Sequence, residues 1–177
     1  PDAVSKLVTV CAAHQPHPMA QAWRLVQRET IELARKAGLP EQGVAVARKL
    51  AMTTYRTPEE FAERFDPRPG SADSVGHYLQ ARGRDFANRT CAARYLTLSA
   101  AIDRHNELPE KIIVPALIVG ALSDRLVPLD DIAELHRRYA GPSQFAAFSS
   151  LYGHDAFLKE TETIGHHLQS FLEESPA

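Results

Sequence analysis

Two residues of this chain, Asp124 and His154, have the types and the positions that proton-transfer chemistry requires. Asp124 directly follows a strongly apolar segment, and His154 directly follows the next segment of strand character. Functional groups in open α/β sheets gather at the carboxyl ends of strands, where loops leave a rigid scaffold. A histidine there can take a proton from a nucleophilic hydroxyl, while a buried carboxylate holds the imidazole in the correct tautomer. The two residues therefore predict the acid and the base of a catalytic triad.

Each residue also has an ordinary explanation. Asp124 alone is typical of a turn or a cap, and His154 alone is typical of a loop histidine after a glycine. An acid followed by a histidine, after two strands separated by a helix, matches the order Ser, Asp, His of α/β-hydrolase enzymes and favours the catalytic interpretation. The nucleophile itself is missing, because the sequence contains no G-x-S-x-G.

The rest of the sequence predicts the elements that must hold these residues. Short β-rich apolar runs predict strands, and apolar residues that recur every three or four positions predict helices. The expected strands cover residues 5–13, 111–120 and 144–149. The expected helices cover residues 20–36, 42–52, 58–65, 75–86, 91–105, 130–139 and 155–173. A capping box at Thr57 starts the third helix, and residues 66–74 have the composition of a surface loop.

This order of elements predicts an α/β fold with an inserted helical lid. Residues 1–13 supply one core strand, residues 14–107 form the lid, and residues 108–177 form the C-terminal part of the core. The strand at 111–120 is apolar nearly throughout, which is typical of a strand buried on both faces of a parallel sheet. Three strands make a thin sheet. We therefore expect this chain, which begins at Pro1, to be part of something longer.

Composition excludes several classes of function. The chain has 177 residues, 44% of them hydrophobic, and a net charge of -2, so no long-range field toward nucleic acid or an anionic membrane is expected. No apolar run reaches the roughly 20 residues that cross a bilayer, and no signal peptide is evident. Cys11 and Cys91 are isolated in the sequence, so we expect them to be reduced thiols and the protein to be cytoplasmic. His14 and His17 lack the further ligands of a metal site.

Five sequence motifs spread over nearly the whole chain carry a resemblance. The segment VPALIVGALSDRLVP at 114–128, followed by YGHDAFL at 152–158, resembles the C-terminal signature of the homoserine O-acetyltransferase family. The segments AVARKLAMTTYRTPEEF at 45–61, YLQARGRDF at 78–86 and RYLTLSAAIDR at 94–104 resemble the lid of that family. The motifs also stand in the same order.

The resemblance implies the C-terminal part of an α/β-hydrolase-fold acyltransferase. Such an enzyme moves an acetyl or succinyl group from acyl-CoA, as co-substrate, to the hydroxyl of homoserine by a ping-pong mechanism. The resemblance makes Asp124 and His154 the acid and the base. It makes Arg48 the partner of the substrate carboxylate and Asp155 the partner of its ammonium group, and Tyr55 lines the pocket. The serine belongs to an N-terminal half, which we expect as a partner chain. We expect no bound cofactor, and a homodimer formed through the lid.

Residue spacing agrees with one part of this assignment. Arg48 and Tyr55 are seven residues apart, about two helical turns, so a continuous helix puts them on one side. The arginine fork suits a carboxylate. The ordinary explanations are a solvated helix arginine for Arg48 and a helix N-cap for Asp155. Rival functions are acyl transfer to L-serine or a natural-product alcohol, an esterase on the same fold, and a non-catalytic half-fold interaction module.

Overall fold

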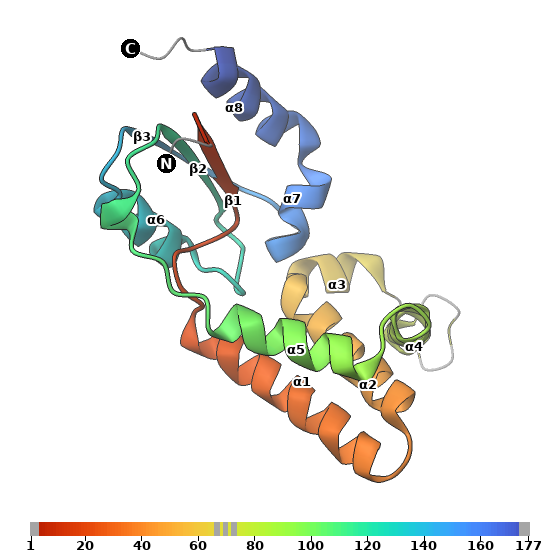
Figure 1. The fold of residues 1–177 in the computed structure, drawn as a ribbon. Coiled ribbons are helices and arrows are strands. Elements are labelled where there is room, and N and C mark those ends of the chain that lie inside the picture. The colour runs from red at the N-terminus through yellow and green to blue at the C-terminus, as the bar shows by residue number, and fades with distance from the viewer. Residues whose placement is uncertain (1–3, 66–67, 69–70, 72–73, 174–177) are drawn as a thin grey trace. The chain divides into compact units, whose positions relative to one another are not determined.

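The chain forms two compact units. The computed structural model describes residues 4–65, 68, 71 and 74–173, so most of the expected loop at 66–74 lies outside the described residues. The first unit, called here the α/β unit, comprises Pro1–His17 and Asn106–Ala177, and the second, called the helical unit, comprises Pro18–His105. Figure 1 shows the strands of the α/β unit and helices α1 to α5 of the helical unit.

A three-stranded parallel sheet forms the centre of the α/β unit. Its strands β1 (Leu7–Val10), β2 (Ala116–Ala121) and β3 (Ser143–Phe148) lie in the order β1-β2-β3. The strand expected at 111–120 begins late, after a 3-10 turn at Pro109–Lys111, and Pro115 marks its start because proline has no N–H for the ladder. Ala121 pairs with Phe148, so β2 and β3 end side by side.

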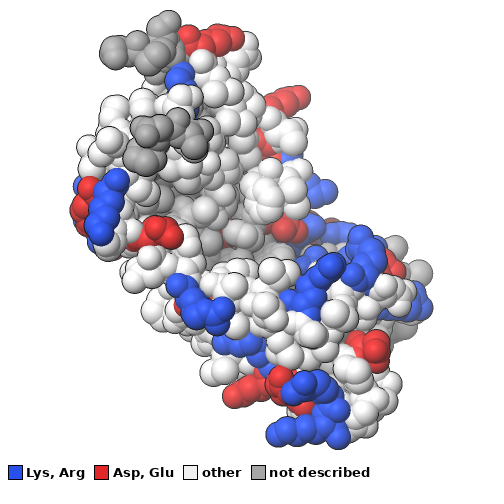
Figure 2. Space-filling model, in the orientation of Figure 1, with Lys and Arg blue, Asp and Glu red and all other residues white. Residues whose placement is uncertain are grey.

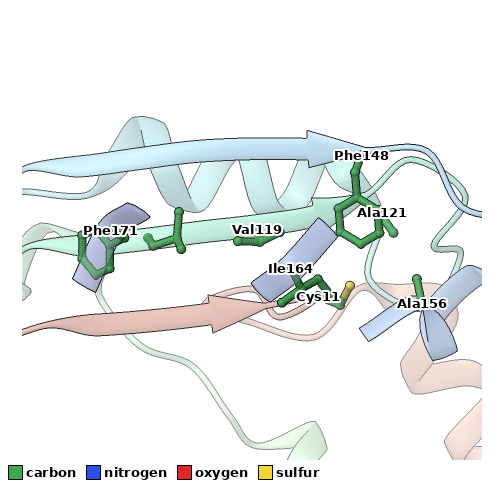
Figure 3. Close-up of a cluster of buried hydrophobic side chains, with 8 residues drawn as sticks. Cys11, Val119, Ala121, Phe148, Ala156, Ile164 and Phe171 are labelled. Carbon is green, nitrogen blue, oxygen red and sulfur yellow. The ribbon is translucent and has the colours of Figure 1, made fainter. Parts of the chain in front are cut away.

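Helices cover both faces of β2, which is buried at all six of its positions. Alternate residues of a strand point to opposite faces. Leu117, Val119 and Ala121 pack in one cluster with Ile164 and Phe171 of α8 (Thr161–Glu173). Figure 3 shows this cluster. Ala116 and Ile118 pack against α6 (Leu129–Arg138) on the opposite face. The expectation of a doubly buried parallel strand is therefore confirmed.

The helix predicted over 155–173 is not continuous. A short 3-10 turn (Gly153–Asp155) leads into α7 (Ala156–Lys159), and α8 begins at Thr161. Glu160 stands between them with φ -90° and ψ 51°, outside the helical region. Its carboxylate accepts a hydrogen bond of 2.8 Å from the Ser150 hydroxyl. This contact with a preceding loop is a tertiary interaction that helical periodicity does not reveal.

The helices of the helical unit match the predicted ones closely. Their bounds are α1 (Pro18–Lys36), α2 (Pro40–Tyr55), α3 (Pro58–Arg64), α4 (Val75–Ala87) and α5 (Ala92–Asp103). The predicted cap is confirmed, because the Thr57 hydroxyl accepts a hydrogen bond of 3.1 Å from the Glu60 N–H. Gly43 brings α2 close to α1, since a Cβ there would lie 2.7 Å from the Cβ of Ala34 and 2.9 Å from the Cα of Ile31.

The surface of the described residues carries both signs of charge. On the face shown in Figure 2, Lys and Arg side chains of the helical unit lie among Asp and Glu side chains. None of the helices in the described part of the chain has both the length and the apolarity to cross a membrane.

Candidate active site

The carboxylate of Asp124 is buried and fully engaged in hydrogen bonds. It lies in the turn after β2, and its side chain has no exposed surface. Its Oδ1 atom accepts from the backbone N–H groups of Leu126 at 2.8 Å and Val127 at 3.0 Å. Its Oδ2 atom lies 2.8 Å from Nδ1 of His154. A buried carboxylate costs free energy unless donors surround it, and here three donors do so.

The imidazole of His154 is held at the end of the next strand. Gly153 has φ +60°, a left-handed conformation that glycine adopts without strain, and this turn presents the histidine after β3. The ring of Phe157 packs beside the imidazole, with centroids 5.5 Å apart and an interplanar angle of 69°. The ring is therefore fixed on one side by a carboxylate and on another by an aromatic side chain.

The pair Asp124 and His154 has the geometry of an acid that orients a base. Because an ionised carboxylate only accepts hydrogen bonds, Nδ1 of His154 carries the proton of their bond. The other ring nitrogen is then the basic one. The His154 side chain is 19% exposed. The structure thus brings together the two residues predicted to be the acid and the base, at the carboxyl end of the sheet where parallel α/β folds gather functional groups.

Cys11 lies close to this pair, and the sequence analysis did not assign it a place there. It follows β1 with φ 50°, unusual for a residue with a side chain, and its N–H donates to the Val119 carbonyl at 2.9 Å. Figure 3 shows Cys11 in the core cluster with Ala121 and Ala156. Ala121 ends β2 just before the turn of Asp124, and Ala156 follows the turn that carries His154. Burial, followed by the negative charge of Asp124, raises the pKa of the Cys11 thiol to about 11.

Asp155, the residue predicted to meet an ammonium group, lies beside His154 in the same 3-10 turn. It is buried, with 7% of its surface exposed. Asp155 stands at the N-cap position of α7, but its side chain makes no capping hydrogen bond there. Capping therefore does not account for the burial of this carboxylate, which costs free energy unless donors surround it.

Arg48 and Tyr55 lie on one helix, α2, as their spacing predicts. The guanidinium of Arg48 is centred 5.6 Å from the Tyr55 ring and 4.8 Å from the Phe86 ring. Stacking on aromatic faces holds a guanidinium in place without neutralising it. Among the described residues, no carboxylate forms an ion pair with Arg48. Arg48 is half-buried and so differs from a solvated helix arginine.

Two other arginines of the helical unit are paired. Arg24 and Arg28 of α1 each lie 2.5 Å from a carboxylate oxygen of Asp103 on α5, and Arg28 also donates to the Ser99 hydroxyl at 2.9 Å. Arg48 therefore has a different environment from its neighbours. Sequence patterns did not identify this contrast, because all three arginines look alike until α1, α2 and α5 pack.

Tyr95 is a further residue near Arg48 that the sequence analysis did not assign to a site. Its hydroxyl donates to Oε1 of the buried Gln27 at 2.7 Å, and its ring packs on Phe86 with centroids 6.0 Å apart. Burial, with a smaller contribution from Tyr55, raises the pKa of Tyr95 well above its usual range, while Arg48 acts in the opposite direction. The phenol thus remains a neutral hydrogen-bonding group at physiological pH.

Among His, Cys, Asp and Glu residues that the structure describes, no group of three or more is arranged to hold a metal ion. The hydrogen bond of 2.8 Å between Asp124 and Nδ1 of His154 orients the imidazole as a base. This arrangement can give acid–base assistance to a nucleophile.

Solved structures define the class of fold. A homoserine O-acetyltransferase from Staphylococcus aureus superposes with a TM-score of 0.80 at 26% identity, covering 98% of this chain and 52% of that protein. Esterase E22 superposes with a TM-score of 0.82 at 18% identity, covering 96% of this chain and 55% of the esterase. Together with the parallel sheet and the acid–histidine pair, these likenesses define the chain as an α/β-hydrolase-fold protein.

Curated relatives define the family. A homoserine O-succinyltransferase from Xanthomonas campestris is 41% identical in an alignment that covers 89% of this chain and 44% of the relative. A homoserine O-acetyltransferase from Thermus thermophilus is 32% identical over 97% of this chain and 47% of its own length. A serine O-succinyltransferase from Litchfieldella anticariensis is 32% identical over 99% of this chain and 57% of its own length. The chain belongs to the homoserine O-acyltransferase family.

The match extends over the chain but not over the relatives. The chain spans about half the length of the curated relatives it matches. No protein-family model matches it. Membership therefore rests on the relatives and on the superposed fold.

The two cysteines should differ sharply in reactivity. Cys11 is buried and Cys91 is exposed. At pH 8 a disulfide reagent should label Cys91 alone, and both should react after unfolding, as peptide mass spectrometry would show. Because the folded pKa of Cys11 lies above the ordinary 9.0, its contribution to stability is complete below pH 9 and is lost as pH rises toward 11. Equal native labelling of both thiols would contradict this burial.

Asp124→Asn should change the tautomer of His154. The amide oxygen can still accept from Leu126 and Val127, so the amide NH₂ would face Nδ1 and donate to it. The ring proton then moves to the other nitrogen, which long-range ¹H–¹⁵N correlation of the imidazole detects. The matched control is Asp130→Asn at an exposed position of α6. An unchanged tautomer in the Asp124 variant would show that the carboxylate does not orient the ring.

Proposed function

We propose that this chain supplies the acid and the base of a homoserine O-acyltransferase. The reaction moves an acetyl or succinyl group from acyl-CoA to the side-chain hydroxyl of homoserine. The observation that carries the proposal is the hydrogen bond of 2.8 Å between Asp124 and His154 at the ends of neighbouring strands. The relatives named homoserine O-succinyltransferase and homoserine O-acetyltransferase support the choice of reaction.

The mechanism has two half-reactions. In the first, His154 removes the proton of a serine hydroxyl, the serine oxygen attacks the thioester carbonyl, and CoA leaves as the thiol after His154 returns the proton. In the second, His154 deprotonates the homoserine hydroxyl, which attacks the acyl-serine ester, and the serine oxygen takes the proton back. Asp124 holds the tautomer and stabilises the imidazolium in both half-reactions.

The serine belongs to an N-terminal portion of the enzyme that precedes this chain or accompanies it. Three observations support this part of the proposal. The sequence contains no G-x-S-x-G, the chain spans about half the length of its relatives, and β1 has a pairing partner on one side only among the described strands. Parallel sheets are covered on both faces, and most sheets have more than the three strands seen here. The missing portion would extend the sheet beyond β1 and would bring the oxyanion-hole amides.

A zwitterionic acceptor requires one fixed cation and one fixed anion. In the helical unit, Arg48 is held by two aromatic rings and has no carboxylate partner among the described residues, and we assign it to the carboxylate of the amino acid. In the α/β unit, we assign buried Asp155 to the ammonium group. Tyr55, which stacks on Arg48, is assigned to the same acceptor. Charge-assisted hydrogen bonds are among the stronger kinds, and a buried charge without its partner is costly, so both ends of the zwitterion contribute to recognition.

L-Serine is the alternative acceptor. It carries the same carboxylate and ammonium groups as homoserine and is one methylene shorter. A relative named serine O-succinyltransferase is 32% identical over 99% of this chain, so L-serine is included as an acceptor in the assay. One methylene in a pocket discriminates by roughly 10- to 200-fold, so the two acceptors are separable by their kcat/KM values.

An assay with two donors and two acceptors tests the reaction. The chain alone should transfer no acyl group, because it lacks the serine. The chain co-expressed with the portion that the relatives have and it lacks should make O-acylhomoserine from acetyl-CoA or succinyl-CoA. His154→Ala should reduce kcat at least about a thousandfold. Acyl transfer by the purified chain alone would contradict the missing nucleophile, and release of free CoA without acylated product would indicate a hydrolase instead.

Arg48→Ala should weaken binding of the acceptor and spare the donor. Loss of the guanidinium leaves the substrate carboxylate without its charged partner, so the KM for homoserine should rise about 30-fold or more while the KM for acyl-CoA stays within about twofold. Lys49→Ala is the matched control, because Lys49 is the adjacent cation and its ammonium group donates to the Gln80 side chain at 2.8 Å. Equal effects on the two KM values would remove Arg48 from the acceptor site.

A further inference from the structure

A second connection joins the loop that carries the acid to the loop that carries the histidine. The hydroxyl of Ser123 donates to the carbonyl oxygen of Ser150 at 2.6 Å. The hydroxyl of Ser150 in turn donates to Oε1 of Glu160 at 2.8 Å and accepts from the N–H of Tyr152 at 3.0 Å. These three hydrogen bonds meet at Ser150, through its carbonyl oxygen and its hydroxyl, and are together called here the serine brace.

The serine brace runs beside the acid–histidine pair without including it. Ser123 immediately precedes Asp124, and Ser150 lies four residues before His154. Glu160 is the residue at which the helix predicted over 155–173 breaks. Each loop is therefore fixed to the other at a point other than the bond between Asp124 and His154. All members of the brace are partly buried, where hydrogen bonds are less weakened by water.

The backbone hydrogen bonds between β2 and β3 do not connect the two loops. The N–H of Leu122 donates to the Phe148 carbonyl at 2.9 Å, which aligns the last residues of β2 and β3. Beyond that point both chains leave the sheet, and the backbone of each loop can vary. The bond from Ser123 to Ser150 is the contact that continues the alignment into the loops, and the bond to the Glu160 carboxylate is charge-assisted and so among the stronger kinds.

We propose that Ser123, Ser150 and Glu160 are positioning residues that set the separation of the Asp124 carboxylate and the His154 imidazole. For its catalytic consequence this inference rests on the proposed function. The brace explains why the chain gives up a helical residue at Glu160, since a continuous helix would carry that carboxylate away from Ser150. A misplacement of about 1 Å among reacting groups costs roughly a hundredfold in rate, so a short brace of this kind has a large effect.

The first experiment uses the full chain and reads the Nδ1-bound proton of His154 by NMR. Ser123→Ala should increase its exchange with water about three- to tenfold, which corresponds to the loss of one hydrogen bond. Ser150→Ala should increase it at least as much, because this change removes the bonds of the hydroxyl to Glu160 and from Tyr152 and keeps the carbonyl that Ser123 binds. Ser123→Thr keeps the hydroxyl and should restore the wild-type rate. Ser143→Ala is the matched control, because the Ser143 hydroxyl also makes one side-chain bond, of 2.9 Å to His136, at the far end of β3.

The second experiment measures kinetics in the assembled acyltransferase. Ser123→Ala, Ser150→Ala and Glu160→Gln should lower kcat about 10- to 100-fold with both KM values within about twofold, because they misplace the base without touching either substrate. Glu160→Gln keeps the acceptor oxygen and should have the smallest effect of the three. Thermal unfolding followed by circular dichroism reports how far each variant, including Ser143→Ala, alters stability.

The outcomes separate this inference from the proposed function. Wild-type exchange and kcat in the Ser123 and Ser150 variants would overturn the brace. So would the same increase in exchange in Ser143→Ala at an equal loss of stability, because the effect would then be general loosening. Should Ser123→Ala fail to fold, Ser150→Ala and Glu160→Gln decide the same question. Absence of the Nδ1 proton in the wild-type protein would instead refute the acid–histidine pair and with it the proposed function.

Discussion

The hydrogen bond between the Asp124 carboxylate and the His154 imidazole is the interaction on which the chemistry of this chain depends. A carboxylate without exposed surface is stable only with donors around it, and Asp124 has two backbone N–H groups and one imidazole N–H. The backbone donors come from its own turn. The imidazole comes from another strand, 30 residues along the chain, so the pair exists only when β2 and β3 lie side by side.

The packing of the α/β unit maintains that arrangement. β2 is covered by α8 on one face and by α6 on the other, so its position is determined from both sides. The register that pairs Ala121 with Phe148 ends both strands at one level. Beyond the ends of the strands, the serine brace and the left-handed turn at Gly153 hold the two loops in place. Close packing resists small displacements, which is the property that an oriented base requires.

The helical unit shows how one residue type acquires two roles. Arg24 and Arg28 neutralise the partly buried Asp103 between α1 and α5, and removing either would leave a charge without its full set of partners. Arg48 rests on the Tyr55 and Phe86 rings instead. Stacking on aromatic faces holds the guanidinium in place and does not neutralise its charge.

The sequence by itself determined the elements and the paired acid and histidine, because hydrophobic periodicity, the Thr57 cap and the order of Asp124 and His154 are local properties. Long-range contacts decided the rest. The break at Glu160 follows from a bond to a distant serine, and the place of Cys11 near the acid follows from the sheet order. Only the packing of helices distinguished Arg24 and Arg28, which pair with Asp103, from Arg48, which stacks on two aromatic rings. The reason is that ion pairing depends on which side chains meet in space, whereas periodicity reports only which face of an element is apolar.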